Sequence, residues 1–209
     1  MCSSDLAVLG RVNRWLSPSV TRIAASFSQL AHVAPGLANR ITVTGNPVRP
    51  AVIAHARPYA RPVPGGPINL LVFGGSQGAR VFSSLVPDAV ARLSEDIRSR
   101  LKIVQQCRPE DLDRVQQQYA ALGLAPQLAA FFNNMGDLLA NSHLVICRAG
   151  ASTVTEACAV GRPAILIPYP FAMDDHQSAN ARQLEREGAA WAFREADLTA
   201  DILAAKITE

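Results

Sequence analysis

From residue 68 to residue 193, short apolar runs alternate with segments of helical periodicity. Continuous apolar runs of this length are typical of strands buried on both faces, as in parallel sheets. The helical segments between them supply the crossovers that parallel strands need. The pattern predicts an α/β fold, a Rossmann-like doubly wound parallel sheet of about six strands. The predicted strands are 68–73, 101–105, 128–132, 144–147, 163–167 and 190–193.

The sequence contains proline and glycine signals for the ends of the helices between these strands. Pro87 lies inside the first, at 79–98, and predicts a kink or break there. Gly123, Gly161 and Gly188 follow helical segments and suit their ends. The remaining helices are predicted at 109–122, 136–141, 153–160 and 175–187, with a last one starting near Thr199.

The residues before the sheet have a different organisation. Helical periodicity at 7–17 is followed by two short strand patterns, at 22–27 and 40–44, and then by a turn-rich segment. Residues 57–67 contain four prolines and two glycines, which is typical of a linker or surface loop. We therefore predict that residues 1–66 are the end of another domain with its hinge and linker. Residues 67–209 would form a ligand-binding domain.

The two ends of the chain lack the usual boundary signals. Residues 1–6 have no periodicity and join abruptly to the first helical pattern, and the last residues stop within another helical pattern. Our hypothesis is that both ends are truncated and that residues 1–6 are not native sequence.

Composition limits the functional classes. Hydrophobic residues make up 49% and charged residues 18% of 209 residues, enough for a packed core. The net charge of +3 comes without a run of basic residues, which argues against nucleic acid but suits an anionic small molecule or an anionic membrane surface. The four cysteines form no CxxC pair, so neither a zinc site nor a disulfide framework is indicated, and a reducing cytosol is the default. The sequence shows neither a signal peptide nor an apolar run of membrane-spanning length.

Three loops at strand ends contain the candidate site residues. The first, Gly74-Gly75-Ser76-Gln77-Gly78, joins a strand to a helix. Its glycines permit close backbone approach, and N–H groups at the helix start attract an anion. It matches neither the phosphate loop of nucleoside triphosphatases nor GxGxxG. A tight turn that needs glycine for geometry alone is the alternative.

The second loop follows the strand 144–147 and contains Arg148, Gly150 and Ser152 before Glu156. A carboxylate one turn into a helix, beside anion-attracting N–H groups, suggests a nucleotide-sugar site. The alternative is a capping box, in which Glu156 folds back on the N–H of Thr153.

The third loop, residues 168–180, places Asp174, Asp175, His176 and Gln177 at a helix start. Either aspartate could be an N-cap, and His176 and Gln177 could be solvated residues of the first turn. The functional interpretation gives His176 and Gln177 sugar hydroxyls to bind. His176 could instead be a catalytic base, but the sequence assigns it no partner carboxylate. A metal site at the aspartates lacks a third ligand at a fixed spacing.

Four stretches together resemble a known family. They are TGNPVR at 44–49, FGGSQGAR at 73–80, CRAGASTVTE at 147–156 and DDHQSANA at 174–181. The chain resembles, from about Ala7 to Glu209, the C-terminal half of the MurG family. These are bacterial hexosyltransferases that use UDP-N-acetylglucosamine (UDP-GlcNAc).

The resemblance implies a glycosyltransferase B fold with the donor, UDP-GlcNAc, in this half. By position, Arg49 and Ser76 would contact the diphosphate, beside the backbone of Gly74, Gly75 and Gly78. The strand end at Phe131 and Phe132, with Met135 nearby, would hold the uracil through backbone groups, and Glu156 would accept the ribose hydroxyls. His176 and Gln177 would meet the GlcNAc hydroxyls. Gln77, Arg148, Gly150 and Ser152 fall within the matching motifs and are expected at the same site.

The reaction implied is transfer of GlcNAc to lipid I with inversion, giving lipid II in peptidoglycan synthesis, at the cytoplasmic face of the inner membrane. It implies no cofactor, no metal and no nucleic acid. The general base would belong to the other half, so no catalytic residue is expected in this chain and the isolated piece should be inactive. An alternative is a non-catalytic UDP-sugar-binding subunit of a split glycosyltransferase.

Two further classes are disfavoured by the residues present. A nucleotide-sugar epimerase of the same fold needs catalytic carboxylates and histidines that we cannot place here. A dehydrogenase would need GxGxxG and an acidic residue after the second strand, where Cys107 and Arg108 stand instead.

Overall fold

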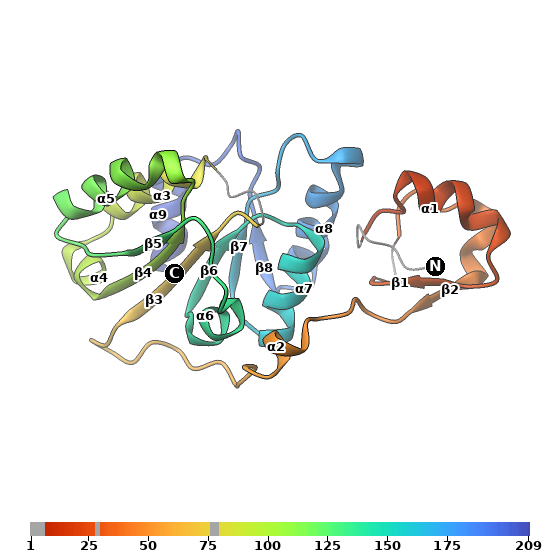
Figure 1. Cartoon of the computed structure of the whole chain (residues 1–209), viewed down its shortest axis with the longest axis horizontal. Coiled ribbons are helices and arrows are strands. Elements are labelled where there is room, and N and C mark those ends of the chain that lie inside the picture. The colour runs from red at the N-terminus through yellow and green to blue at the C-terminus, as the bar shows by residue number, and fades with distance from the viewer. Residues whose placement is uncertain (1–6, 28–29, 76–79) are drawn as a thin grey trace.

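A sheet of parallel strands forms the centre of the computed structural model, which describes residues 7–27, 30–75 and 80–209 (Figure 1). Within those residues the sheet has six strands in the order β5-β4-β3-β6-β7-β8, all parallel. Numbered from its first strand, this is the order 3-2-1-4-5-6 of dinucleotide-binding folds. The predicted fold is thus confirmed. The strands are β3 (Ile68–Phe73), β4 (Leu101–Gln106), β5 (Gln127–Ala129), β6 (Leu144–Cys147), β7 (Ala164–Leu166) and β8 (Ala190–Ala192).

Helices cover both faces of this sheet (Figure 1). On one face, α3 (Phe82–Ala91), α5 (Leu112–Ala121) and α9 (Ala200–Thr208) pack on the strands, with α4 (Glu95–Arg100) beside them. The other face carries α6 (Met135–Asn141), α7 (Ala151–Val160) and α8 (His176–Arg186). Two short 3-10 helices, η3 (Pro109–Asp111) and η4 (Met173–Asp175), precede α5 and α8.

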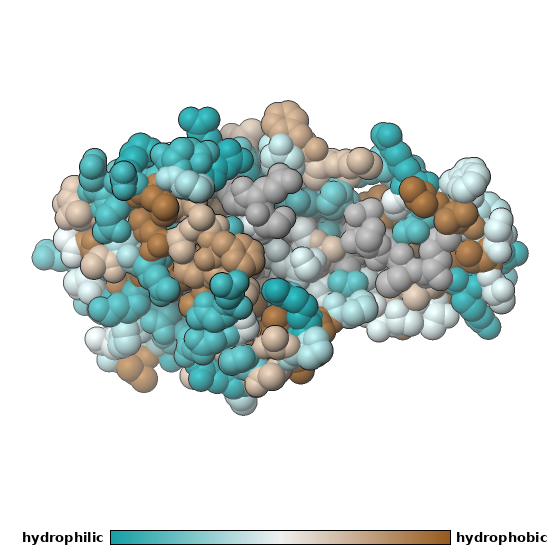
Figure 2. All heavy atoms as spheres, viewed as in Figure 1, coloured by the Kyte–Doolittle hydropathy of each residue, from teal (hydrophilic) through white to brown (hydrophobic). Residues whose placement is uncertain are grey.

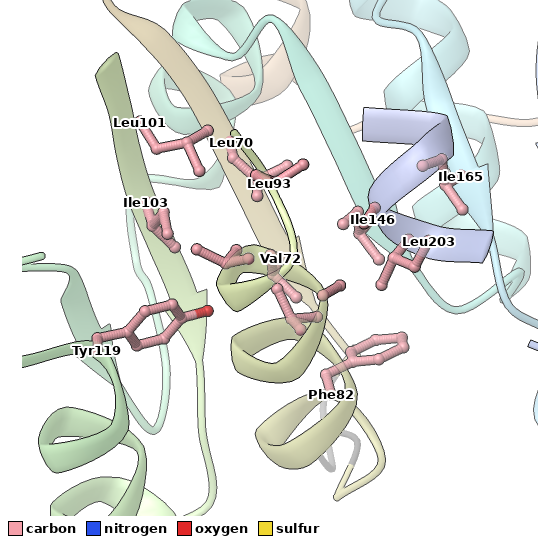
Figure 3. Packing of buried hydrophobic residues seen from close by; sticks show 14 of the residues in the cluster. Leu70, Val72, Phe82, Leu93, Leu101, Ile103, Tyr119, Ile146, Ile165 and Leu203 are labelled. Atoms are coloured by element: carbon pink, nitrogen blue, oxygen red, sulfur yellow. The ribbon is translucent and has the colours of Figure 1, made fainter. Parts of the chain in front are cut away.

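Alternate side chains of the central strands feed two separate cores. Leu70 and Val72 of β3 point to the α3 side, where Figure 3 shows them packed with Phe82 and Ile103. Leu71 and Phe73 belong to the core on the α7 side. Because both faces are covered, these strands need apolar residues at every position, which is why they read as continuous runs.

The residues before the sheet form a smaller body. It contains α1 (Arg11–Leu16), 3-10 turns η1 (Ser17–Ser19) and η2 (Pro35–Arg40), and two parallel strands, β1 (Ile23–Ala25) and β2 (Ile41–Val43). The predicted helix from residue 7 was wrong at its start, since Val8 forms a parallel bridge with Ala31. Residues 7–9 are buried and bond to Ala31 through their backbone, so their apolar character reflects this pairing rather than a helix face.

A short helix that the sequence did not predict, α2 (Pro50–Ile53), joins the small body to the sheet domain. It packs on α6 and α7, and its Val52 is buried in the core on that side. A Cβ placed on Gly136 of α6 would lie 2.7 Å from the Ala51 carbonyl oxygen. Glycine at 136 thus allows the two helices to touch backbone to backbone.

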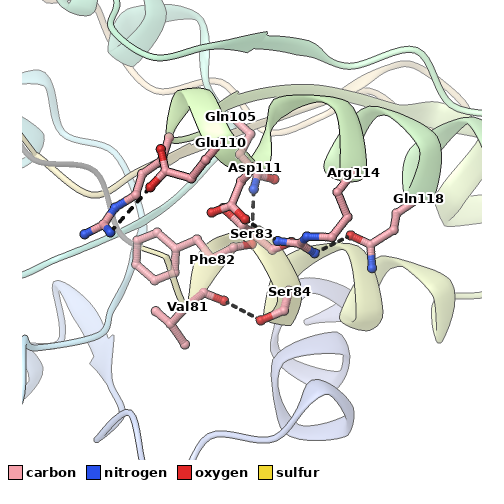
Figure 4. Close-up of polar contacts among 10 residues, drawn as sticks. Val81, Phe82, Ser83, Ser84, Gln105, Glu110, Asp111, Arg114 and Gln118 are labelled. Atoms are coloured by element: carbon pink, nitrogen blue, oxygen red, sulfur yellow. Dashed lines mark hydrogen bonds and ion pairs between the residues drawn. The ribbon is translucent and has the colours of Figure 1, made fainter.

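The predicted helix at 79–98 is two helices, α3 and α4, and Pro87 does not separate them. The break falls at residues 92–94, where Ser94 caps α4 by accepting a hydrogen bond from the Ile97 N–H. Proline at 87 cannot donate to the carbonyl of Ser83, one turn earlier. That oxygen instead accepts from Arg114 Nη1 of α5 at 3.2 Å, in the cluster of Figure 4. A neighbouring helix therefore satisfies the carbonyl that Pro87 leaves unpaired, and α3 continues through the proline.

The surface is mixed in character. Figure 2 shows polar and apolar residues interspersed on the viewed face of both bodies, with a constriction between them. Among the described residues, no helix is both long enough and apolar enough to cross a membrane. Residues 1–6, which we expect to be non-native, lie outside the described residues.

Candidate functional site

The strand order reverses between β3 and β6, and a cavity of about 330 Å³ opens at the carboxyl ends of these strands. Ligands of open α/β sheets bind at such a switch point. Seven of the described residues predicted for the site line this cavity: Arg49, Gly75, Phe131, Phe132, Met135, Ser152 and Glu156. The rest of the lining consists of Pro47, Phe73, Gln106 and Thr153.

Arg49 and Glu156 form a two-pronged ion pair across the cavity. Arg49 Nε lies 2.7 Å from Glu156 Oε1, and Nη2 lies 2.9 Å from Oε2. The hydrogen bond to Glu156 raises the pKa of Arg49 despite some desolvation by burial. Each carboxylate oxygen keeps a further lone pair, and the guanidinium keeps further N–H groups. The pair can therefore offer acceptors to hydroxyls and donors to an anion at one place.

The capping-box interpretation of Glu156 was wrong. Helix α7 begins at Ala151 with Gly150 as its N-cap, three residues before the N-cap position that a capping box would give to Thr153. Glu156 is therefore already inside the helix, and Arg49, 107 residues away in the chain, takes both of its oxygens. A charged two-pronged pair is stronger than a single bond to a backbone N–H.

The glycine loop after β3 is fixed by one buried side chain at the end of β4. Gln106 Oε1 accepts from the Gly74 N–H at 3.0 Å, and its Nε2 donates to the carbonyls of Gly75 and Ala130. Gly75 has φ +83°, a conformation that favours glycine. Ser76, Gln77 and Gly78 lie outside the described residues. Gln106 thus positions the start of this loop against the loop after β5.

Sequence reasoning missed Gln106. The available signal was a pair of glutamines, Gln105 and Gln106, closing an apolar strand at the ligand-binding edge of the sheet. Gln105 Oε1 accepts a hydrogen bond from the Tyr119 hydroxyl, and its Nε2 donates to the Phe82 carbonyl. Gln105 therefore connects α5 and α3 and does not contact the glycine loop through these bonds.

An apolar wall faces the ion pair. Phe132 is buried and Phe131 exposed, and both follow β5 in irregular backbone instead of ending a strand. Met135 opens α6 beside them. Aromatic and thioether side chains of this kind suit the flat face of a base.

The third loop lies outside the lining of this cavity. His176 Nδ1 is 2.8 Å from the Met173 carbonyl oxygen, which can only accept, so Nδ1 carries the hydrogen and Nε2 is an acceptor in the neutral ring. Gln177 Oε1 accepts from the Tyr169 N–H at 2.9 Å, so the group left to a ligand is its NH₂. Asp175 occupies the N-cap position of α8 without a side-chain capping bond, and Asp174 instead pairs with Arg14.

Arg148 is directed away from the cavity. Its guanidinium is buried, donates to the carbonyls of Ile167 and Pro168, and lies between the rings of Phe82 and Tyr169. Nη1 is also 2.6 Å from Glu195 Oε2, although not in a hydrogen-bonding direction. The structure gives Arg148 a structural role below the second loop.

The start of α7 supplies polar groups to the cavity instead. Gly150 has no side chain to cap the helix. The first N–H groups of a helix lack intrahelical partners, and Ser152 and Thr153 of that turn line the cavity. Among the described residues, we found no group of three histidine, cysteine, aspartate or glutamate side chains that could hold a metal ion.

Comparison with known proteins identifies the family. A family model described as the glycosyltransferase family 28 C-terminal domain matches residues 69–209. The chain belongs to this family.

Two curated relatives of this chain carry the same name. Both are named UDP-N-acetylglucosamine--N-acetylmuramyl-(pentapeptide) pyrophosphoryl-undecaprenol N-acetylglucosamine transferase. The protein of Paramagnetospirillum magneticum is 53% identical over 202 residues, which are 96% of this chain and 54% of that protein. That of Granulibacter bethesdensis is 52% identical, over 96% of this chain and 52% of that protein. The chain therefore spans about half the length of the curated relatives it matches.

A solved structure agrees with the fold of the family 28 domain. The crystal structure of Acinetobacter baumannii MurG superposes with a TM-score of 0.78 at 31% identity. The match covers 98% of this chain and 56% of that protein. The MurG resemblance seen in the four motifs is thus confirmed.

Proposed function

We propose that this chain binds UDP-GlcNAc as the donor-binding part of a hexosyltransferase that transfers GlcNAc to lipid I. One observation carries the proposal: the Arg49–Glu156 pair stands between a glycine loop and an apolar wall, at the switch point of a family 28 domain. Those three features match the diphosphate, ribose and base of a nucleotide. The printed names of the relatives supply the donor sugar and the acceptor.

Each part of the donor has a matching group. We assign the uracil to Phe132 and Met135, and the ribose hydroxyls to the remaining lone pairs of Glu156. The diphosphate would lie against Arg49, the glycine loop and the first N–H groups of α7. Because α7 begins at the cavity, where Ser152 and Thr153 line it, the positive end of its dipole faces the place where the negative charge would collect.

The transfer requires the enzyme to stabilise the departing UDP and to accept the proton of the acceptor hydroxyl. The 4-hydroxyl oxygen of the acceptor forms a bond to C1 of GlcNAc as the bond from C1 to the β-phosphate oxygen breaks, with inversion. Arg49 and the helix start stabilise the departing UDP by electrostatics, without a metal. The hydroxyl proton passes to a base that we assign to the remainder of the protein, together with the binding of lipid I.

We further propose that the enzyme works at the cytoplasmic face of the inner membrane, since its acceptor is lipid-linked. The relatives' names state an undecaprenol-bound acceptor, which supports this location. The family membership favours a transferase over the epimerase and dehydrogenase alternatives.

Calorimetry with two nucleotides tests the site. Wild-type chain, Glu156→Ala and a control, Asp201→Asn, are titrated with UDP and with 2′,3′-dideoxy-UDP. If Glu156 binds the ribose hydroxyls, UDP should bind the wild type and the control about tenfold or more tightly than the dideoxy nucleotide, since charged hydrogen bonds contribute roughly 1.5–3 kcal/mol. In Glu156→Ala the two nucleotides should bind equally.

Two results would overturn parts of the proposal. If the wild type bound no UDP, the donor-site proposal would fail. If Glu156→Ala kept the preference for UDP, the ribose would lie elsewhere. UDP-GlcNAc and UDP-glucose, compared on the same wild-type chain, measure the contribution of the N-acetyl group.

A further inference from the structure

A segment of the small body, residues 7–14, touches the sheet domain at two points of the third loop and its helix. The first contact passes through Asn180 of α8, which is fully buried. Its Oδ1 accepts from the Ala7 N–H at 3.0 Å, and its Nδ2 donates to the Ala149 carbonyl at 3.1 Å. Asn180 therefore connects the start of the small body to the loop that leads into α7.

The second contact is an ion pair. Arg14 Nη2 of α1 donates to Asp174 Oδ2 at 3.0 Å, and Arg11 Nε lies 4.0 Å from Oδ1. The side chains of Arg14 and Asp174 are 34% and 19% exposed, so the pair is partly withdrawn from water. Such a pair is less screened by salt than a fully exposed one.

The backbone beneath this pair is in an unfavourable conformation. Asp174 and Asp175 have φ of +53° and +50°, the left-handed region, in which residues other than glycine are uncommon. Two such residues in succession persist only where surrounding contacts hold them. The ion pair of Arg14 is one such contact, because it fixes the side chain of Asp174 itself.

The residues that follow this turn are the two predicted to meet the donor sugar. His176 is fixed by its bond to the Met173 carbonyl, at the start of the same turn. Gln177 is fixed by the Tyr169 N–H, earlier in the third loop. The direction of His176 therefore depends on how residues 173–175 are held, and Gln177 follows the same residues in the first turn of α8.

We propose that Arg14 is a positioning residue for the donor sugar. Through Asp174 it holds the 173–175 turn in its left-handed form, and so directs His176 Nε2 and the Gln177 amide toward the sugar hydroxyls. The inference rests on the proposed donor function. It assigns a role in sugar recognition to a residue of the small body that touches neither the sugar nor the nucleotide cavity.

The test separates the sugar from the nucleotide. UDP and UDP-GlcNAc are titrated into wild type, Arg14→Ala, Arg14→Lys and Asp174→Asn. Asparagine keeps the size of aspartate and tolerates the left-handed region, so this variant removes the charge alone. Arg92→Ala, which breaks the exposed Arg92–Asp201 pair at 2.8 Å, is the matched control.

The variants should lose affinity only for the ligand that carries the sugar. Arg14→Ala and Asp174→Asn should bind UDP-GlcNAc roughly three- to tenfold more weakly than the wild type, the span expected for loss of a partly buried ion pair. Both should bind UDP as the wild type does, since the nucleotide cavity has no lining residue from this turn. Arg14→Lys should recover part of the loss, and Arg92→Ala should change neither ligand.

A second readout needs no ligand. Nitrogen NMR of His176 should show the Nδ1-protonated ring in the wild type and a shift toward the Nε2-protonated ring in Asp174→Asn. The inference fails if the variants lose UDP and UDP-GlcNAc affinity equally, or if both ligands and the His176 tautomer are unchanged. It also fails if wild-type chain binds UDP-GlcNAc no more tightly than UDP. Only absence of UDP binding by the wild type would overturn the donor function as well.

Discussion

At the scale of single residues, the two partners of the Arg49–Glu156 pair differ in their exposure to solvent. The side chain of Glu156 is 6% exposed and that of Arg49 is 62% exposed. A buried charge that loses its partner is left without solvation, whereas an exposed charge is taken up by water. The two partners therefore differ in what their removal does to the fold.

Arg49→Met should destabilise the chain by about 1–3 kcal/mol, because it leaves a buried carboxylate unpaired. Glu156→Gln should cost less than about 1 kcal/mol, since the freed guanidinium is already in water and the amide still fills the same space. Urea unfolding monitored by circular dichroism measures both. Equal losses, or a larger loss for Glu156→Gln, would contradict the geometry.

A second carboxylate, Asp111, makes a contribution to stability that depends on pH. The Arg114 guanidinium, 2.7 Å from its Oδ1, holds the pKa of Asp111 below its usual range, against the opposing effect of burial (Figure 4). The folded state therefore binds this proton less readily than the unfolded chain, whose aspartates titrate near pH 3.9. The resulting stability is complete above that pH and is lost as the pH falls through the folded pKa.

We predict that Asp111→Asn flattens this acid dependence. Between pH 5 and pH 3, the free energy of unfolding should fall less in Asp111→Asn than in the wild type. Asp113→Asn, an exposed position on the same helix, is the control and should follow the wild type. Urea unfolding at the two pH values tests it, and parallel declines for all three proteins would refute it.

At the scale of elements, the contact between α2 and α6 links the cavity to the core. Arg49 is the N-cap of α2, and a Cβ added at Gly136 would lie only 2.7 Å from the Ala51 carbonyl oxygen. The position of α2 on α6 therefore determines the position from which the Arg49 side chain extends into the cavity. A substitution of Gly136 should therefore displace Arg49 at the candidate site, although Gly136 itself does not line the cavity.

Gly136→Ala should lower stability by about 1–3 kcal/mol through overpacking. In an unobstructed helix the same change would stabilise by nearly 1 kcal/mol, so the sign is diagnostic. UDP affinity should fall with it, because α2 must shift. Gly36→Ala, where a Cβ meets nothing within 4 Å, is the control for both measurements. An increase in melting temperature for Gly136→Ala would exclude the close contact.

The elements also show what local sequence can predict. The bounds of β3 and β6 were predicted to the residue, because strands buried on both faces are marked by continuous apolar runs. Helix α2 was missed because four residues carry no periodicity, and the start of α1 was misplaced because buried extended residues resemble a helix face.

The site was partly predictable for the same reason. Two of the motifs contain Gly75 and Glu156, and the predicted end of the strand 128–132 led to Phe132 and Met135; all four line the cavity, although β5 itself ends at Ala129. Partners distant in the chain were not readable. Nothing local to Glu156 indicates Arg49, and nothing in the second loop indicates that Arg148 donates to the carbonyls of Ile167 and Pro168.

At the scale of the whole molecule, the division of the chain at residue 67 remains a prediction. The packing of α2 favours an earlier boundary, since Val52 is buried in the core of the sheet domain. The prolines of the linker then lie within the domain as a strap, with Arg57 donating to the Ala140 carbonyl. We propose that the independently folding unit begins near Gly45.

A shortened chain of residues 45–209 should therefore be more stable than one of residues 67–209. The difference should be at least about 1.5 kcal/mol, the value of burying a valine side chain. Thermal unfolding of the two pieces measures it, with UDP titration as a second readout because only the longer piece contains Arg49. Equal stability would place the boundary at the linker after all.

The order of the strands also has a consequence for the timing of folding. Leu70 of β3 lies beside Leu144 of β6, roughly 70 residues later in the chain. At a synthesis rate of about 5–20 residues per second, β6 would leave the ribosome some 4–14 s after β3. During that interval one edge of β3, a mostly apolar strand, has no partner, so the nascent chain should be most dependent on chaperones while the central pair is incomplete. The cavity at the switch point, which is lined by residues that follow β3 and β6, can form only when that interval ends.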